Sequence, residues 1–348
     1  MVSETIKNEL GPVLIWGAGA VGGTIGAALA RAGIQVQMAD VNIEHCQACS
    51  ETGLKITGPL ETYLQRVPCV TPKQITGTFH QIILAVKGPS TADAVNDLVK
   101  HLPDDGYVLS AQNGLAEHYL SKRIGVERVM GGFVNFGADW LRAGEILYGN
   151  RGAVVIGEVD GGIQMRTRAM QKLLQCFEPN VLVTNNIMGY LWGKMCYGAM
   201  LFATALTGES MAKNFADPSR ISTFASIGKE VIATAVAEGV SPESFDGFQP
   251  LAFMPGSKPK DFDRCMADLA EFNSKSAKSH SGIHRDLAVR RRATEVDFQP
   301  GLVAKIASKH GVSTPLLKRL VGLIHDIEEG KINMCAETFQ LLREEITK

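Results

Sequence analysis

A single lysine interrupts a long apolar stretch of the sequence, and the chemistry of a lysine depends strongly on such surroundings. Lys194 follows Trp192 and Gly193 and precedes Met195, in a segment whose side chains are apolar almost throughout. Lysine is almost never fully buried without a partner. Either its stem is buried while the ammonium reaches solvent, or the ammonium is held in a cleft, where a partly buried cation can donate a proton. These residues alone leave both interpretations open.

Other polar residues also stand where the chain could use them in chemistry. Lys87 and Asn113 each follow an apolar run that predicts a strand, and ligands of open α/β sheets bind at the carboxyl ends of strands. Glu295 and Thr294 lie in the charged run 290–297. Each has an ordinary alternative: a loop lysine, an Asn-Gly turn, one acid of a solvated run, and a helix cap.

A glycine-rich turn lies near the amino terminus, between an apolar run and a helix of small residues. It consists of Gly17, Ala18, Gly19, Ala20, Val21 and Gly22. In a dinucleotide-binding turn, Gly17 would permit the tight turn, Gly19 would let the backbone approach a pyrophosphate, and Gly22 would let the helix pack on the strand. The helix N-terminus then offers N–H groups to the phosphates. Such turns also serve structural ends, but the strand before and the helix after favour dinucleotide binding.

An acidic residue at the end of the second predicted strand bears on the choice of dinucleotide. A carboxylate at Asp40 can accept hydrogen bonds from the adenosine ribose hydroxyls, whereas a 2′-phosphate would be repelled and would need an Arg or Lys. No basic residue follows in Val41, Asn42 and Ile43. The sequence therefore favours NAD(H), with NADP(H) as the alternative.

These residues need elements to position them, and the first half of the chain alternates short apolar runs with helical stretches. This alternation predicts a parallel β-sheet covered by helices on both faces. Gly144 and Arg151-Gly152 are typical of turns and favour hairpins, so the later strands could run antiparallel. The predicted strands are 13–16, 36–39, 81–86, 108–110, 129–136, 153–156 and 181–184.

After residue 186 the pattern becomes helical and stays so, which predicts a Rossmann domain over residues 1–186 and a helical domain over 187–348. The stretch 187–206 is about as long as a membrane span. Lys194 interrupts it, Gly193 and Gly198 loosen it, and no second span accompanies it. A buried helix between the two domains is therefore favoured over a transmembrane one.

Composition excludes several classes of protein. The 348 residues include 35 basic and 36 acidic side chains, a net charge of -1 that argues against a nucleic-acid binder. The start of the chain has no apolar signal region, which indicates a cytoplasmic protein without a membrane anchor. Seven cysteines, an odd number, suit reduced thiols. Cys46 and Cys49 form a C-x-x-C on what reads as a surface helix, where incidental thiols are favoured over redox or metal use.

Taken together, these motifs resemble the ketopantoate reductase (2-dehydropantoate 2-reductase) family over most of the chain. Each motif is weak alone, and their order carries the resemblance. They are Gly17 to Gly22, Ala-Val-Lys87, Gln-Asn113-Gly114, Trp192-Gly-Lys194, Ser281-Gly-Ile-His-Arg-Asp286, Thr-Glu295-Val-Asp297, Gly301 and Thr314-Pro315.

The resemblance implies an α/β fold, in which a Rossmann dinucleotide-binding domain precedes an all-α domain like the C-terminal one of 6-phosphogluconate dehydrogenase, with the active site between them. It implies Lys194 as the general acid, Glu295 as the residue that orients it and the substrate, and Ser281 as a substrate contact. Asn113 and Lys87 would line the cofactor and substrate side.

The sequence departs from the family pattern at several positions. The family commonly prefers NADP(H), often with a basic residue after the second strand, where this chain has Asp40. Asparagines usually stand four and eight residues beyond the lysine and hold polar groups of the substrate, but here Gly198 and Phe202 stand there. The spacing from Asp286 to Glu295 is also one residue longer than in the better-known members. A substrate other than ketopantoate is therefore expected.

The predicted function is hydride transfer between a nicotinamide dinucleotide and the carbonyl of a small 2-keto acid, with a small carbonyl or hydroxy-acid compound as the partner. Two alternatives stay open. One is another 2-hydroxyacid or opine-type dehydrogenase on the same fold, and the other is a non-catalytic dinucleotide-sensing protein. The apolar C-terminal helices could pair into a homodimer, although a large intramolecular core would have the same pattern.

Overall fold

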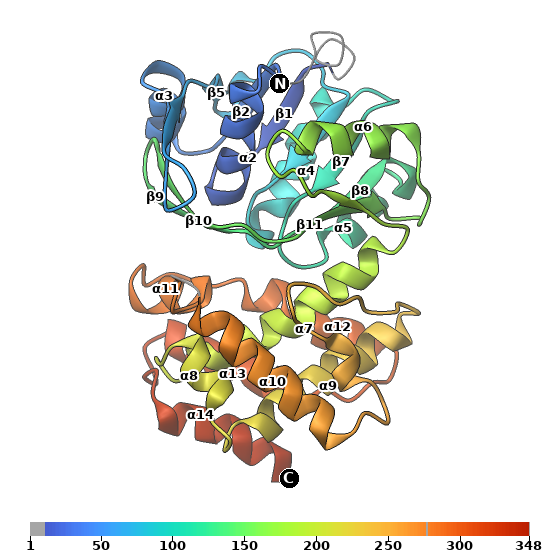
Figure 1. Ribbon diagram of the computed structural model, residues 1–348. Helices are drawn as coiled ribbons and strands as arrows, with labels where there is room; N and C mark the ends of the chain where they lie inside the picture. The colour runs from blue at the N-terminus through green and yellow to red at the C-terminus, as the bar shows by residue number, and fades with distance from the viewer. Residues whose placement is uncertain (1–10, 276–277, 348) are drawn as a thin grey trace. The chain divides into compact units, whose positions relative to one another are not determined.

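A computed structural model describes residues 11–275 and 278–347, and within them the chain forms two compact units (Figure 1). The first unit ends at Ile187 and the second begins at Met188. Among the described helices, none has the length and apolar character needed to cross a membrane.

The first unit is built on an eight-stranded sheet with the order β12-β11-β8-β7-β6-β1-β2-β5. All neighbouring strands run parallel except β8 and β11, which are antiparallel. The predicted parallel sheet and the reversal among its later strands are confirmed. The strands are β1 (Val13–Trp16), β2 (Val36–Ala39), β5 (Cys69–Val70), β6 (Gln81–Leu84), β7 (Tyr107–Ser110), β8 (Val129–Val134), β11 (Val154–Glu158) and β12 (Leu182–Val183).

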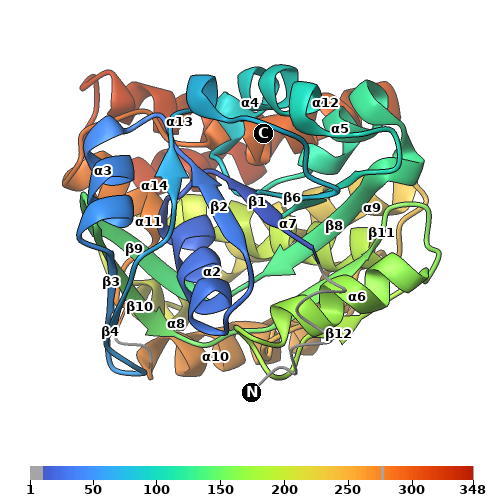
Figure 2. The ribbon, with the colours of Figure 1, turned by 90° about the horizontal axis from the view of Figure 1, so that it is seen from above.

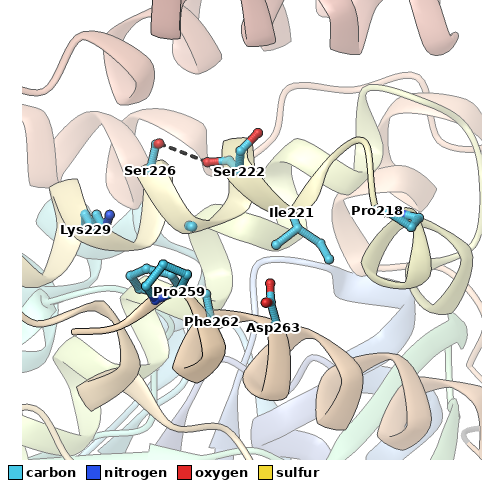
Figure 3. A pocket seen from close by; sticks show the side chains of 9 residues that line it. Pro218, Ile221, Ser222, Ser226, Lys229, Pro259, Phe262 and Asp263 are labelled. Atoms are coloured by element: carbon cyan, nitrogen blue, oxygen red, sulfur yellow. Dashed lines mark hydrogen bonds between the residues drawn. The ribbon is translucent and has the colours of Figure 1, made fainter.

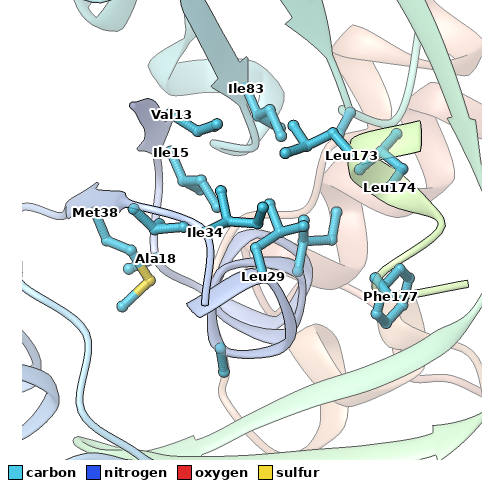
Figure 4. Close-up of a cluster of buried hydrophobic side chains, with 14 of the residues drawn as sticks. Val13, Ile15, Ala18, Leu29, Ile34, Met38, Ile83, Leu173, Leu174 and Phe177 are labelled. Atoms are coloured by element: carbon cyan, nitrogen blue, oxygen red, sulfur yellow. The ribbon is translucent and has the colours of Figure 1, made fainter. Parts of the chain in front are cut away.

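Helices cover both faces of this sheet, as the view in Figure 2 shows. Side chains of a strand alternate between faces, so Val13 and Ile15 of β1 enter one core cluster while Leu14 and Trp16 enter the other. The helices α2 (Ala20–Arg31) and α6 (Met165–Leu174) contribute to the first cluster, part of which is drawn in Figure 4. The helices α4 (Thr91–Leu98) and α5 (Ala116–Ile124) contribute to the second.

A second sheet, which the sequence did not predict, packs against α2. Its order is β4-β3-β10-β9, formed by β3 (Leu54–Thr57), β4 (Tyr63–Gln65), β9 (Gly137–Arg142) and β10 (Glu145–Asn150). Between β2 and β3 runs α3 (Ile43–Glu51). Gly23 of α2 allows the close approach, because a Cβ atom there would lie 2.5 Å from Cδ1 of Ile146. The second sheet thus contacts the helix that follows the glycine-rich turn.

The second unit is helical, as predicted. Its helices are α7 (Ile187–Ala205), α8 (Met211–Ala216), α9 (Ile221–Ala237), α10 (Pro259–Ser274), α11 (Gly282–Ala288), α12 (Pro300–Lys309), α13 (Pro315–Glu328) and α14 (Ala336–Arg343). Both units also contain short 3₁₀ turns: η1 (Pro72–Gln74), η2 (Gly88–Ser90), η3 (Val99–His101), η4 (Val126–Arg128), η5 (Pro250–Phe253), η6 (Val296–Phe298) and η7 (Glu344–Thr347).

The helix α7 lies among the other helices of the second unit. Tyr197 packs against the ring of Phe215 of α8 and its hydroxyl contacts Asn273 of α10, while the thiol of Cys196 points to the carbonyl of Gly228 of α9. The predicted buried helix is therefore confirmed, since most of its apolar side chains are buried.

A half-buried carboxylate joins two of the surrounding helices. Glu230 of α9 accepts hydrogen bonds from the backbone N–H groups of Leu316 and Leu317, both at 2.9 Å. These N–H groups belong to the first turn of α13, where intrahelical acceptors are missing. Burial raises the pKa of Glu230 to about 7, although the two N–H groups act in the opposite direction.

This arrangement predicts a pH-dependent contribution to stability. The folded protein keeps the Glu230 proton up to about pH 7, whereas the ordinary pKa is 4.5, so the free energy of unfolding falls as pH rises between these values. In Glu230→Gln the free energy of unfolding should fall less steeply with pH. The difference in this free energy between wild type and variant should change by about 2 kcal/mol from pH 5 to 7.5. Urea unfolding at both pH values measures it. Equal slopes for the two proteins would contradict the prediction.

Candidate functional site

The three glycines of the amino-terminal turn differ in what surrounds them. Gly17 has a φ of +102°, and a Cβ atom there would lie 2.8 Å from the backbone nitrogen of Val86. A Cβ atom on Gly22 would overlap the carbonyl oxygen of Gly17. A Cβ atom on Gly19 would meet nothing within 4 Å. Gly17 and Gly22 are thus needed by the fold itself, whereas Gly19 leaves its backbone open on the side where a ligand could approach.

The first turn of α2 is equally open. Gly19 is its N-cap and makes no side-chain capping hydrogen bond. The backbone N–H of Gly19 donates to none of the described residues. Uncapped N–H groups at the positive end of a helix bind anions. The turn and the helix therefore fit the pyrophosphate of a dinucleotide, with Gly19, Ala20 and Val21 as the residues that would hold it.

The Asp40 carboxylate is fixed beside this turn. One of its oxygens accepts a hydrogen bond from the backbone N–H of Ala18 and the other from that of Asn42, each at 2.9 Å. Each carboxylate oxygen can accept more than one hydrogen bond. Asp40 can therefore hold the turn and still accept from ribose hydroxyls.

Lys87 and Asn113 follow neighbouring strands of the main sheet. Leu84 at the end of β6 pairs with Ser110 at the end of β7, and each candidate comes three residues later. Both are exposed. Gln112, for which the sequence predicts no role, links the two loops: its amide donates to the carbonyl of Val86 at 2.9 Å and to the Thr91 hydroxyl at 2.8 Å.

Lys194 belongs to the one stripe of α7 that is not fully buried. From Gly189 to Phe202 the half-buried residues are Tyr190, Lys194, Tyr197 and Leu201, and all others are buried. Spacings of four, three and four residues place these side chains on one face of a helix. The ammonium of this helix thus lies on its partly exposed face, while Phe202 points into the apolar interior with no exposed surface.

The side-chain amide of Gln299 lies beside α7, on the side that carries Lys194. Gly198 stands one turn after Lys194, and a Cβ atom there would lie 3.1 Å from the side-chain oxygen of Gln299. Gln299 thus fills the space that a side chain at position 198 would take. No motif of the sequence points to Gln299, because only the fold brings position 299 to α7.

Glu295 stands at the start of η6 and is half-buried. The segment around it is tied to α13: the Thr294 hydroxyl and backbone N–H both donate to Glu328 at 2.7 Å, and His325 contacts Glu328 and Asp297 at 2.8 and 3.2 Å. Thr294 therefore does more than cap a helix, since it fastens the chain next to Glu295. Although burial alone would lower the pKa of His325, the two carboxylates raise it.

Ser281 is buried and serves as the N-cap of α11, where its hydroxyl oxygen accepts a hydrogen bond from the backbone N–H of His284 at 3.2 Å. Five residues later, Asp286 is buried and bound to Arg290 and Arg292 at 3.1 and 2.9 Å. The arginine run is thus only partly a solvated face, as two of its three members bind this carboxylate.

The helix α3, which carries Cys46 and Cys49, lies at the surface with Ile43, Glu44, Gln47 and Ser50 exposed, but neither cysteine belongs to its exposed side. Both side chains are buried, because α3 packs its His45, Cys46 and Cys49 side inward. The thiols of Cys46 and Cys69 lie 3.5 Å apart, and all seven cysteines are free. The described residues contain no group of three or more His, Cys, Asp or Glu side chains that could hold a metal ion.

A groove of about 470 Å³ lies between α9 and α10 in the second unit (Figure 3). Ile221, Lys229, Phe262 and Asp263 are among its lining residues, and the ammonium of Lys229 lies 4.5 Å from the centre of the Phe262 ring. None of the residues predicted for the site lines this groove.

Comparisons with known proteins agree with this geometry. Residues 13–161 match the family described as ketopantoate reductase PanE/ApbA, and residues 186–328 match ketopantoate reductase PanE/ApbA C terminal. The 2-dehydropantoate 2-reductase of Streptococcus pyogenes serotype M3 is 24% identical over 324 residues, covering 92% of this chain and 99% of that protein.

Two solved structures have the same fold. A ternary structure of D-mandelate dehydrogenase with NADH and anilino(oxo)acetate matches with a TM-score of 0.81 at 22% identity, covering 92% of this chain and 99% of that one. A dimeric ketopantoate reductase from Staphylococcus aureus matches with a TM-score of 0.70 at 19% identity, covering 92% and 100%.

The glycine-rich turn on a parallel sheet, followed by an all-α unit, defines a nicotinamide-dinucleotide-dependent oxidoreductase that acts on CH–OH groups. The chain belongs to the ketopantoate reductase family. The family predicted from the order of the motifs is therefore confirmed.

The open space at Gly19 generates a prediction. In Gly19→Ala the new methyl group meets no protein atom, so the fold is retained, but the group enters the space for the pyrophosphate and weakens NADH binding about tenfold or more. Calorimetric titration measures the affinity. Gly322→Ala, in α13, is the control, since a Cβ atom there also meets nothing within 4 Å. Equal affinities of the two variants for NADH would contradict this role of Gly19.

Proposed function

We propose that this protein is a reductase that transfers hydride from a reduced nicotinamide dinucleotide to the carbonyl carbon of a small 2-keto acid, with Lys194 as the general acid. The observation that carries the proposal is the position of Lys194 on the partly exposed stripe of an otherwise buried helix. A lysine at such a position keeps its stem packed while its ammonium stays accessible to a ligand.

The dinucleotide, when bound, supplies the hydride. The chain's own residues handle charge and protons. As negative charge develops on the carbonyl oxygen, Lys194 donates a hydrogen bond to it and then transfers its proton, which leaves a neutral amine and an alcohol. The reverse reaction returns the proton to Lys194. Glu295 orients the ammonium and the substrate, and its segment is fixed for this task by the bonds of Thr294 to Glu328.

The remaining assigned residues bind rather than react. Gly17 to Gly22 hold the pyrophosphate, and Lys87 and Asn113 line the cofactor and substrate side at the ends of β6 and β7. Ser281 contacts the substrate. Its hydroxyl oxygen is held by the N–H of His284, so its own proton can be donated to a substrate oxygen.

NAD(H) is the dinucleotide we propose, with NADP(H) as the alternative. Asp40 is held in place at both of its oxygens by backbone N–H groups. A fixed carboxylate accepts from ribose hydroxyls and repels a 2′-phosphate.

The substrate is proposed to differ from ketopantoate. Gly198 and Phe202 stand where the family usually has asparagines, and Phe202 is fully buried. Gln299 supplies an amide beside Gly198 instead. A 2-hydroxyacid or opine-type dehydrogenase on the same fold is the second candidate. D-mandelate dehydrogenase, which has this fold, was solved with NADH and anilino(oxo)acetate, so a substrate panel should include aromatic 2-keto acids.

We further propose a homodimer in the cytoplasm, by analogy with the dimeric ketopantoate reductase of Staphylococcus aureus. The remaining alternative, a dinucleotide-sensing protein without catalysis, makes the opposite prediction for turnover. Oxidation of bound NADH by any carbonyl compound in a single turnover would exclude it.

Removal of the Lys194 ammonium tests the proposed mechanism. In Lys194→Ala, kcat with the best substrate of the panel should fall about 100-fold or more, because proton donation and charge stabilisation are both lost. The Kd of NADH, measured by fluorescence titration, should stay within about twofold. Lys229→Ala removes a lysine of the groove between α9 and α10 and should keep full turnover. Wild-type turnover in Lys194→Ala would rule out the general-acid role.

Cofactor choice has its own test. Wild type should bind NADH at least about tenfold more tightly than NADPH, since one charge-assisted hydrogen bond contributes about 1.5–3 kcal/mol. Asp40→Asn keeps an oxygen that can accept from the Ala18 N–H but removes the negative charge. Asp40→Asn should therefore reduce the preference for NADH over NADPH, mainly because NADPH binds more tightly once the negative charge is gone. Fluorescence titrations with NADH and with NADPH measure the two Kd values, and an unchanged ratio of these values in Asp40→Asn would contradict the role of Asp40.

A further inference from the structure

We infer that His45 positions the dinucleotide turn, by holding the carbonyl of Ala18 so that the next N–H faces the pyrophosphate. The inference rests on the proposed dinucleotide binding at the turn. His45 lies in α3, with 1% of its surface exposed, and its Nε2 atom is 2.8 Å from the carbonyl oxygen of Ala18. The glycine motif contains no sign of this contact, because 27 residues separate the two partners.

The proton on the imidazole can be placed from its neighbours. The backbone N–H of Gly144 lies 3.0 Å from Nδ1 of His45, and the indole N–H of Trp140 lies 3.3 Å from the same atom. Both groups can only donate. Nδ1 must therefore accept and carry no proton, so Nε2 carries the hydrogen and donates it to Ala18. The Cys49 thiol, 3.6 Å from Nε2, is the second neighbour of that nitrogen.

Side chains thus hold the Ala18 residue at both of its backbone groups. Its N–H donates to Asp40 at 2.9 Å, and its carbonyl accepts from His45. The two anchors are themselves connected: Asp40 accepts from the Asn42 N–H, and the Asn42 side chain accepts from the His45 N–H, both at 2.9 Å.

The geometry of the peptide unit gives this contact a consequence for binding. In a trans peptide the carbonyl of one residue and the N–H of the next point in opposite directions. With the Ala18 carbonyl fixed against His45, the Gly19 N–H is turned to the opposite side. That N–H donates to none of the described residues, and it belongs to the glycine whose surroundings are open. His45 therefore acts as a positioning residue, through the peptide between Ala18 and Gly19.

A structural role must be distinguished from this one, since His45 also binds the β9–β10 hairpin through Gly144 and Trp140. Two substitutions separate the two sides of the ring. In His45→Gln the side-chain amide can reach the position of Nε2 and donate to Ala18, but the acceptor for Gly144 is lost. In His45→Asn the shorter side chain reaches only the position of Nδ1, so the bond to Ala18 is lost.

The positioning role predicts different binding by these variants. ADP-ribose serves as the binding probe. His45→Asn should raise the Kd of ADP-ribose and the KM of NADH about tenfold, with little change in kcat. In His45→Gln both values should stay within about threefold of those of wild type. Trp140→Phe removes one donor to Nδ1 and keeps the bond to Ala18, so it should bind ADP-ribose as wild type does. Thermal melting of each full-length variant reports the structural contribution separately.

Other outcomes would overturn the inference. These are equal affinity in all variants, or losses that follow the melting temperatures instead of the bond to Ala18. If His45→Asn does not fold, a folded His45→Gln or Trp140→Phe with tenfold weaker binding is itself contradictory. Wild-type protein that binds neither ADP-ribose nor NADH would instead refute the proposed function, which separates the two failures.

Discussion

The approach of backbone to backbone at the glycine-rich turn is the constraint on which the first unit depends. Gly17 lies against the backbone of Val86, and Gly22 lies against the carbonyl of Gly17, at distances that leave no room for a Cβ atom. The turn is therefore held between β1 and the chain that leaves β6, and α2 begins in a fixed direction. Everything that a dinucleotide needs from this unit follows from that direction: open N–H groups at the helix start, a carboxylate beside them, and strand ends that carry further polar residues.

The second unit carries one charged side chain, Lys194, on the otherwise apolar helix α7. A helix as apolar as α7 is stable only if it is surrounded, and α8, α9 and α10 contact it. Lys194 lies on the half-buried stripe of this helix. Small residues on the helix make room for the neighbouring segments: a Cβ atom on Gly193 would lie 2.5 Å from the carbonyl oxygen of Glu243, and Gly198 faces Gln299.

Local patterns explain which parts of the molecule could be predicted from the sequence. The glycine spacing, the alternation of apolar runs with helices, and the apolar character of α7 each lie within a short window, and each prediction was confirmed at the level of the fold. The second sheet was missed because its strands lack the continuous apolar runs of the main sheet: β3 is buried only at alternate positions, and β4 has no buried residue. His45 and Gln299 were missed because a side chain's partners 27 to about 100 positions away leave no periodic signal.

The glycine at position 23 has a mechanical consequence for the first unit. With no side chain there, Ile146 of the second sheet touches the backbone of α2 directly, and close-packed interiors respond to displacement as rigid bodies. The turn, the helix and the second sheet are consequently expected to move together. The phosphate-binding end is therefore expected to keep the same shape in the empty and the loaded protein.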